Sequence, residues 1–252
     1  MGEIMKIAVA GKGGVGKTTF TALLIKQLVE ANKGAILAVD ADPNSNLNEA
    51  LGIEVHASIA DILDEVKGGK AIPEGMPKDV YVEYRLSQVL NETDYVDLVV
   101  MGVPQGSGCY CYPNDLMRKY LENLRQNYDY VVIDNEAGME HLARRVVTDI
   151  DYLFVVSDAS ARGIRSAGRV FDIVKTVGIN VKNIYLVITK VLPTGIEELK
   201  PEIEATGLEV VGTIPYDEVV ARYDLAGKPL VELPADSPSV LAVKNIFSKL
   251  AL

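Results

Sequence analysis

The residues best suited to do chemistry form the run Gly11-Lys12-Gly13-Gly14-Val15-Gly16-Lys17-Thr18-Thr19, near the start of the chain. This run has the spacing Gly-x4-Gly-Lys-Thr of a phosphate-binding loop. In such a loop, backbone N–H groups wrap the α- and β-phosphates, Lys17 reaches the β- and γ-phosphate oxygens, and the Thr18 hydroxyl binds Mg²⁺. The run therefore predicts a site for a nucleoside triphosphate and Mg²⁺.

The segments on either side of this run support the same interpretation. The apolar stretch 4–10 before it predicts a strand, and the stretch 17–31 after it predicts an amphipathic helix with apolar positions at Phe20, Leu23, Leu24 and Leu28. The positive end of that helix dipole would face the bound phosphates. A glycine-rich turn that only joins a strand to a helix is the alternative, and these flanking patterns disfavour it.

A second lysine, Lys12, directly follows the first glycine of the run. With it, the chain resembles the deviant Walker A ATPases, the superfamily of MinD, ParA and the nitrogenase iron protein. The resemblance implies an ATP-hydrolysing homodimer in which Lys12 reaches the nucleotide of the other subunit. A cation supplied in this way would neutralise charge that develops during phosphoryl transfer. An exposed, solvated Lys12 is the alternative.

Acidic residues at the ends of predicted strands are the next candidates, because ligands of a parallel sheet bind beyond its carboxyl ends. Asp134 closes the apolar run 130–133, as a Walker B acid does, and is expected to hold Mg²⁺ through water. The segment Val39-Asp40-Ala41-Asp42-Pro43-Asn44 resembles switch I of the superfamily, which implies that Asp42 polarises the attacking water and Asp40 supports the Mg²⁺ shell. Helix N-caps are the alternative role for Asp42 and Asp134.

Two later segments resemble those with which the superfamily holds adenine. Thr189-Lys190 follows a late strand, with Thr189 at a position where many members have Asn, and Ile214-Pro215-Tyr216-Asp217 follows the next strand. The resemblance implies that Thr189, Lys190 and Pro215 contact the nucleotide. The aliphatic stem of Lys190 and the backbone around Pro215 are suited to form walls for the ring.

Cys109 and Cys111 form a Cys-x-Cys motif ahead of a predicted helix, whose dipole favours thiolate over thiol. Two thiolates provide half of the four ligands that a closed soft-metal site needs, and a two-fold dimer would supply the rest. The motif therefore predicts one Ni²⁺ or Zn²⁺ bound between two copies of the chain. Two unligated cysteines in a loop are the alternative.

The Gly-Cys-Tyr-Cys string, together with Glu136-Ala137-Gly138-Met139-Glu140-His141-Leu142 and the segment 212–218, resembles the CooC-type accessory ATPases. That resemblance implies nickel insertion into carbon monoxide dehydrogenase or acetyl-CoA synthase. Glu136, Glu140 and His141 are candidate ligands for a metal in transit, although such residues more often cover a solvated helix face. An iron–sulfur cluster of the nitrogenase iron protein would need a cysteine in this switch II segment, and none is present.

Composition narrows the classes of partner. The chain has 252 residues, 25 Lys and Arg against 35 Asp and Glu, and a formal net charge of -10. This charge has the wrong sign for a protein that binds mainly DNA or an anionic membrane, and it therefore disfavours a positioning role of the MinD or ParA type. No apolar run is long enough to span a bilayer, and lysines interrupt any signal-peptide pattern, so we expect a cytoplasmic protein without membrane insertion.

The alternation of short β-branched runs with amphipathic stretches predicts one α/β domain over 1–252, with a mostly parallel sheet and helices on both faces. By its resemblance it is a P-loop NTPase of the SIMIBI class and MinD type. The predicted strands cover 4–10, 35–40, 95–101, 130–134, 152–157, 184–189 and 208–213. The predicted helices cover 17–31, 46–52, 59–66, 114–127, 139–148, 164–177, 196–204, 217–225 and 237–250.

Two stretches are less regular. Residues 68–78 form a predicted surface loop, and 80–90 are compatible with an edge strand. Residues 68–94 show no clear resemblance to the family. The apolar face of 237–250 suits a terminal helix packed on the core, and a membrane-targeting helix is the alternative.

Overall fold

The computed structural model describes residues 4–42, 46–68, 72–103, 119, 127–135, 149–177, 179–250 and 252. Its centre is a seven-stranded sheet in the order β3-β2-β4-β1-β5-β6-β7, and all neighbouring strands run parallel. The strands are β1 (Met5–Gly11), β2 (Ile36–Asp40), β3 (Asp97–Val100), β4 (Tyr130–Asp134), β5 (Asp149–Asp158), β6 (Asn180–Val191) and β7 (Glu209–Pro215). Each of the seven predicted strands is present, which confirms the predicted fold class.

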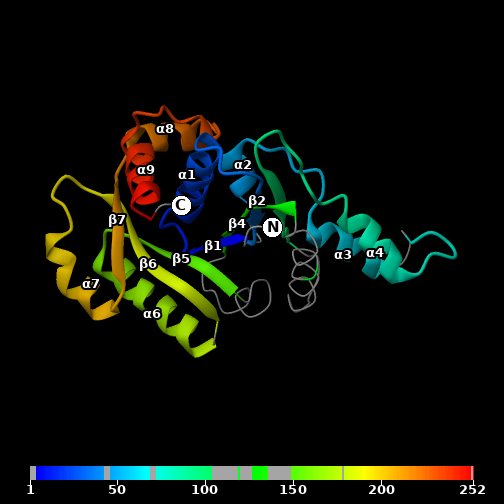
Figure 1. The fold of residues 1–252 in the computed structure, drawn as a ribbon, viewed down its shortest axis with the longest axis horizontal. Helices are drawn as coiled ribbons and strands as arrows, with labels where there is room; N and C mark the ends of the chain where they lie inside the picture. The colour runs from blue at the N-terminus through cyan, green and yellow to red at the C-terminus, as the bar shows by residue number, and fades with distance from the viewer. Residues whose placement is uncertain are drawn as a thin grey trace.

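Side chains of successive residues in each strand point to opposite faces of the sheet, and both faces are covered. Ile7 of β1 faces one core cluster with Val132 of β4, its partner in register, whereas Ala8 and Ile133 face the other side. Figure 1 shows α1 (Lys17–Glu30), α8 (Glu218–Leu225) and α9 (Pro238–Leu250) together on one side of the sheet, and α6 (Ala161–Val177) on the other. The remaining helices are α2 (Leu47–Leu51), α3 (Ile59–Gly68), α4 (Lys78–Leu86) and α7 (Lys200–Thr206), with short 3-10 turns η2 (Glu197–Leu199) and η3 (Leu230–Glu232).

The structure corrects the expectation of an edge strand within 80–90, because helix α4 covers most of this stretch. Alternating apolar residues suggested a strand, yet Val82 and Leu86 are spaced by one helical turn and are both buried in the core cluster that includes Ile59 and Ile62 of α3. The valine and tyrosine on the other side of α4, Val80 and Tyr84, are exposed. Packing against α3 therefore decides the helical conformation.

The C-terminal helix α9 packs on the core, as the more favoured interpretation of its sequence predicted. Its apolar residues Val240, Val243, Ile246 and Phe247 are buried in the cluster that also contains the apolar face of α1. Within the described ranges, none of the helices combines the length and the apolar character that crossing a bilayer takes. The predicted helices 114–127 and 139–148 lie outside the described residues, apart from Lys119 and Asn127.

Candidate nucleotide-binding site

The glycine-rich loop leaves the central strand β1 and ends at the first residue of α1. Gly16 caps α1 with a left-handed φ of 90°, and its carbonyl accepts the first helical hydrogen bond, from Phe20 N at 3.0 Å. At Gly11 a Cβ atom would collide with the carbonyl oxygen of Val156 on the neighbouring strand β5. Both positions therefore require glycine, which explains why the loop can turn within a few residues without leaving the sheet edge.

Two of the acids predicted from the sequence, Asp40 and Asp134, lie side by side behind this loop. Asp40 and Asp134 are the last residues of β2 and β4 and are paired in register. Thr18 on α1 donates its hydroxyl hydrogen to Asp134 Oδ2 at 2.6 Å, and Thr21 Oγ1 lies 3.3 Å from Asp134 Oδ1. The order β2-β4-β1 thus brings the ends of two strands and the first turns of α1 to one point, as expected for ligand sites at the carboxyl edge of a parallel sheet.

Both carboxyl groups are shielded from solvent, and this alters their acidity. Burial raises the pKa of Asp40 to about 7, with the nearby Asp134 adding to the shift, although N–H donors from Leu47 and Asp42 oppose it. Burial likewise raises the pKa of Asp134 to about 6, while hydrogen bonds from Thr18 and the charge of Lys17 act in the opposite direction. Burial therefore outweighs the hydrogen bonds and the Lys17 charge that favour ionisation of these two acids.

This arrangement fits Mg²⁺. The Thr18 hydroxyl and the two carboxyl groups are hard oxygen ligands of the kind that Mg²⁺ takes in phosphate-binding sites. A divalent cation beside them would also supply the positive charge that the pair of buried acids calls for. Thr18, Asp134 and Asp40 are therefore the residues that would hold the ion, directly or through water.

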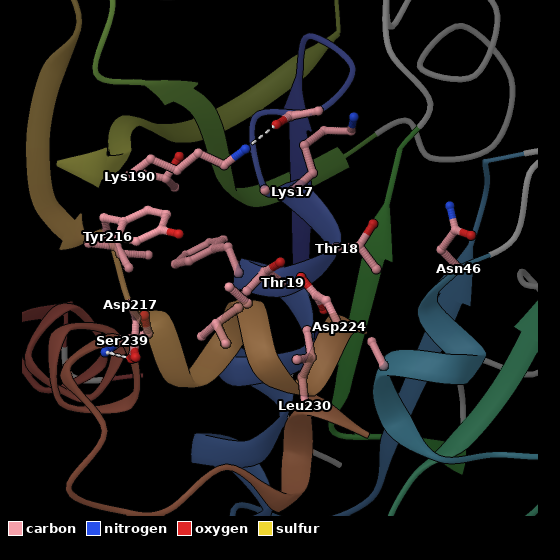
Figure 2. A pocket seen from close by; sticks show the side chains of 18 of the residues that line it. Lys17, Thr18, Thr19, Asn46, Lys190, Tyr216, Asp217, Asp224, Leu230 and Ser239 are labelled. Atoms are coloured by element: carbon pink, nitrogen blue, oxygen red, sulfur yellow. Dashed lines mark hydrogen bonds between the residues drawn. The ribbon is translucent and has the colours of Figure 1, made fainter. Parts of the chain in front are cut away.

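A cavity of about 740 Å³ opens in front of the loop and extends to the region between α8 and η3. Figure 2 shows Lys17 and Thr18 at one end of this cavity and Tyr216, Asp217 and Ser239 at another. Its volume suits a small-molecule ligand of nucleotide size. Of the residues predicted from the sequence, those that line the cavity are Gly13, Gly14, Gly16, Lys17, Thr18, Thr19, Asp42, Thr189, Lys190 and Pro215.

Comparison with known proteins identifies the type of domain. A family model described as the CobQ/CobB/MinD/ParA nucleotide binding domain matches residues 6–230. The chain belongs to this family. The MinD/ParA-type domain is a nucleotide-binding ATPase, which confirms the enzyme class predicted from the loop.

Relatives of this MinD/ParA-type domain match it over nearly its whole length. An uncharacterised ATP-binding protein of Methanocaldococcus jannaschii is 45% identical over 249 residues, which cover 98% of each chain. The carbon monoxide dehydrogenase accessory protein CooC of Rhodospirillum rubrum is 29% identical and covers 91% of this chain and 90% of its own. The crystal structure of a ParA family ATPase from Chlorobium tepidum shares the fold, with a TM-score of 0.75, 20% identity and coverage of 99% and 100% of the two chains.

The end of strand β6 contacts the loop of the MinD/ParA-type domain directly. The Thr189 hydroxyl lies 2.6 Å from the carbonyl oxygen of Val15. Lys190 Nζ lies 2.7 Å from the carbonyl oxygen of Gly14, a contact that Figure 2 marks with a dashed line. Thr189 is buried, and its hydroxyl is engaged with backbone carbonyls. Contact of these two side chains with adenine, which the resemblance implied, remains a prediction.

Several cavity residues were not singled out from the sequence. Asp217, in the predicted Pro215 segment, caps α8 by accepting from Val219 N at 2.8 Å and also accepts from Ser239 N at 3.0 Å and Ser237 Oγ at 2.5 Å. Burial raises its pKa, but these three hydrogen bonds outweigh that effect and the pKa is lowered. Asp217 therefore joins the N-termini of α8 and α9 at the wall of the cavity. An Asp at the start of a predicted helix, a common N-cap residue, was its local signal in the sequence.

Asp224 on α8 also lines the cavity. Burial raises the pKa of Asp224, and the charge of Lys190 acts against this shift. Asn46, Glu49 and Leu230 complete the side of the cavity formed by α2 and η3, and no motif in the sequence pointed to them. These positions follow from the packing of elements that are distant in the chain.

Lys12 is exposed, and within the ranges that the structure describes no hydrogen bond or ion pair engages its ammonium group. Lys17 is largely buried and its Nζ lies 3.4 Å from the Lys12 carbonyl oxygen. The predicted metal residues Cys109 and Cys111, and also Glu136, Glu140 and His141, lie outside the described residues. Among the residues that are described, no cluster of three His, Cys, Asp or Glu side chains is arranged to hold a metal ion.

Proposed function

We propose that this ATPase is a dimeric metallochaperone. In this proposal, nickel binds at Cys109 and Cys111 of two subunits and is inserted into carbon monoxide dehydrogenase or acetyl-CoA synthase. The Cys-x-Cys motif and the 29% identity to a carbon monoxide dehydrogenase accessory protein support the proposal. Zn²⁺ competes for the same thiolates, since four sulfur ligands accept it at least as readily as Ni²⁺.

The observation that carries the proposal is the point where the cysteine-bearing segment leaves the sheet. Met101, directly after β3, donates its backbone N–H to the Asp40 carbonyl at 2.8 Å, and its own carbonyl accepts from Ala60 N at 2.9 Å. Asp40 is also one of the two buried acids of the nucleotide site. The segment that leads to Cys109 therefore begins on a residue hydrogen-bonded to the nucleotide-binding edge, and in this proposal it relays a change of nucleotide toward the cysteines.

For hydrolysis, we propose that the loop N–H groups and Lys17 bind the phosphates and that Asp42 orients the attacking water. Asp42 lines the cavity and lies next to the acids in the chain, with its backbone N–H 3.1 Å from Asp40 Oδ1. Bound Mg²⁺ would neutralise charge on the β- and γ-phosphate oxygens. The protein itself positions the nucleotide and excludes bulk water around the buried acids.

Dimerisation follows from Lys12 in this proposal. Its ammonium is exposed at the rim of the loop, while Lys17 of the same loop already points into the cavity. When two copies of the chain close over each other's cavities, the Lys12 ammonium of one copy would lie at the nucleotide of the other. ATP binding would then promote the closed dimer, and hydrolysis would release it.

Metal titration of the anaerobic, reduced protein with ATP tests the proposal. We expect one Ni²⁺ or Zn²⁺ per two chains, proton release on binding, and metal-promoted dimerisation in sedimentation. A Cys109→Ser/Cys111→Ser double variant should lose the metal but keep ATP binding, which serves as the control for its fold. One equivalent per chain, or unchanged tight binding in the double variant, would move the site elsewhere, with Glu136, Glu140 and His141 as the next residues to replace.

A positioning ATPase of the MinD or ParA type is the second candidate, because the fold and the family agree with it. Most apolar side chains of α9 are buried in the core, which disfavours binding of this helix to a membrane, and the net charge of -10 disfavours DNA. ATP-dependent co-sedimentation with anionic vesicles or retention on DNA, together with the absence of metal binding, would favour this candidate. An iron–sulfur absorption spectrum in the purified dimer would instead favour electron transfer.

A further inference from the structure

Two consecutive residues at the end of β6 hold two consecutive carbonyl groups of the phosphate-binding loop. The Thr189 hydroxyl is 2.6 Å from Val15 O and 3.2 Å from Ser157 O, and since it has a single hydrogen the shorter contact defines the bond. The Lys190 ammonium is 2.7 Å from Gly14 O. Thr189 is 5% exposed, so water cannot easily take the place of its hydroxyl.

These bonds determine the direction of the loop N–H groups. In a trans peptide the C=O and the following N–H lie in one plane and point in opposite directions. Holding Gly14 O toward β6 therefore aims Val15 N–H away from β6, and holding Val15 O does the same for Gly16 N–H. Both N–H groups belong to the run whose donors wrap the phosphates of a bound nucleotide.

The backbone around the two residues is itself anchored. Thr189 O accepts from Ala159 N at 3.0 Å on the β5 side, and Val191 O accepts from Tyr216 N at 2.9 Å on the β7 side. Between these bonds Lys190 adopts a left-handed φ of 55°, a conformation that non-glycine residues rarely keep unless the surroundings impose it. Figure 2 shows the Lys190 side chain extended toward the loop, where the dashed line marks its bond.

We propose that Thr189 and Lys190 are positioning residues for the phosphates. They hold the two peptide planes from Gly14 to Gly16 in the orientation that presents N–H donors to the nucleotide, and they act through the loop instead of through the base. This inference rests on nucleotide binding by the family and is independent of the metal-delivery proposal.

The test compares ligands that have phosphates with and without a base. Thr189→Val removes the hydroxyl at almost constant shape, and Lys190→Met removes the ammonium at nearly constant length. We expect ATP and pyrophosphate to lose affinity by the same factor, about 5-fold for Thr189→Val and about 10-fold or more for Lys190→Met, since bonds to charged groups are stronger. The ratio of ATP to GTP affinity should stay at the wild-type value.

Two controls accompany the measurement. Thr189→Ser keeps the hydroxyl and should restore pyrophosphate affinity, whereas Lys244→Met removes an exposed charge on α9, outside the cavity, and should change nothing. Weaker ATP binding with unchanged pyrophosphate binding and a shifted ATP to GTP ratio would assign the two residues to the base and overturn the proposal. Unchanged affinity for every ligand would overturn it as well. Should Thr189→Val fail to fold, Lys190→Met decides between the same outcomes.

Discussion

The buried acid Asp40 allows a quantitative prediction for the stability of the nucleotide-free protein. Its side chain is 0% exposed, and burial raises its pKa from 3.8 to about 7. Between these two values the folded protein holds a proton that the unfolded chain releases. The free energy of unfolding therefore falls as the pH rises through this window, and levels off above pH 7. Asp134, whose pKa is raised to about 6, contributes with the same sign.

The magnitude follows from the shift. A difference of about 3 pKa units, at about 1.4 kcal/mol for each, corresponds to a loss of about 4 kcal/mol from Asp40 alone. Asp40→Asn removes this loss because the amide stays neutral. However, the amide offers one acceptor oxygen where the carboxyl group accepts two backbone bonds, from Asp42 N and Leu47 N. One lost bond should cost about 1–3 kcal/mol at every pH.

The free energies of unfolding of the wild type and Asp40→Asn should therefore converge or cross as the pH rises. Urea denaturation of both proteins from about pH 4.5 to about pH 8 measures this, with circular dichroism as the readout. Asp40→Asn should be the less stable protein in acid and should equal or exceed the wild type at alkaline pH. Asp236→Asn, at an exposed carboxyl group, is the matched control and should follow the wild type. If the free energies of unfolding of the wild type and Asp40→Asn change in parallel with pH throughout, the conclusion that burial raises the pKa of Asp40 is wrong.

The remaining predictions concern the loop and the cavity wall. Lys17→Ala should abolish ATP binding in calorimetry. Lys12→Gln should retain most of the ATP affinity but hydrolyse ATP about 100-fold or more slowly. Normal turnover in Lys12→Gln would exclude a role for Lys12 at the nucleotide of the other subunit. Asp217→Ala should lower the free energy of unfolding by about 2–3 kcal/mol, because it leaves donors of α8 and α9 unpaired, and an unchanged urea midpoint would contradict this. Gly11→Ala should fail to bind nucleotide or to fold, because its Cβ would collide with the Val156 carbonyl oxygen. Gly14→Ala should lose only about 1 kcal/mol of stability, because its Cβ would meet nothing within 4 Å. Equal effects of the two substitutions would show that the collision at Gly11 is relieved elsewhere.

The phosphate-binding loop and the strands could be predicted because their signals are local. A loop of small residues between an apolar strand and an amphipathic helix has few alternative conformations, and Tyr130–Asp134 has the bounds that its apolar run predicted. Strand ends and helix ends shifted by a few residues in most other elements, as expected where fraying and bulges set the limits. The strand prediction for 80–90 was wrong because alternating apolar residues are compatible with a strand, and only packing against α3 selects the helical conformation.

The tertiary structure decided what those local elements do together. The chain sequence determined that Asp40 and Asp134 each end a strand, but only the order β2-β4-β1 makes them neighbours and shields both from water. In the same way the sequence placed Thr189 and Lys190 after a late strand, and only the approach of β6 to the loop turned them toward the Gly14 and Val15 carbonyls. Local propensity acts over a few residues, whereas burial, charge coupling and hydrogen bonds between distant segments exist only once the sheet has assembled.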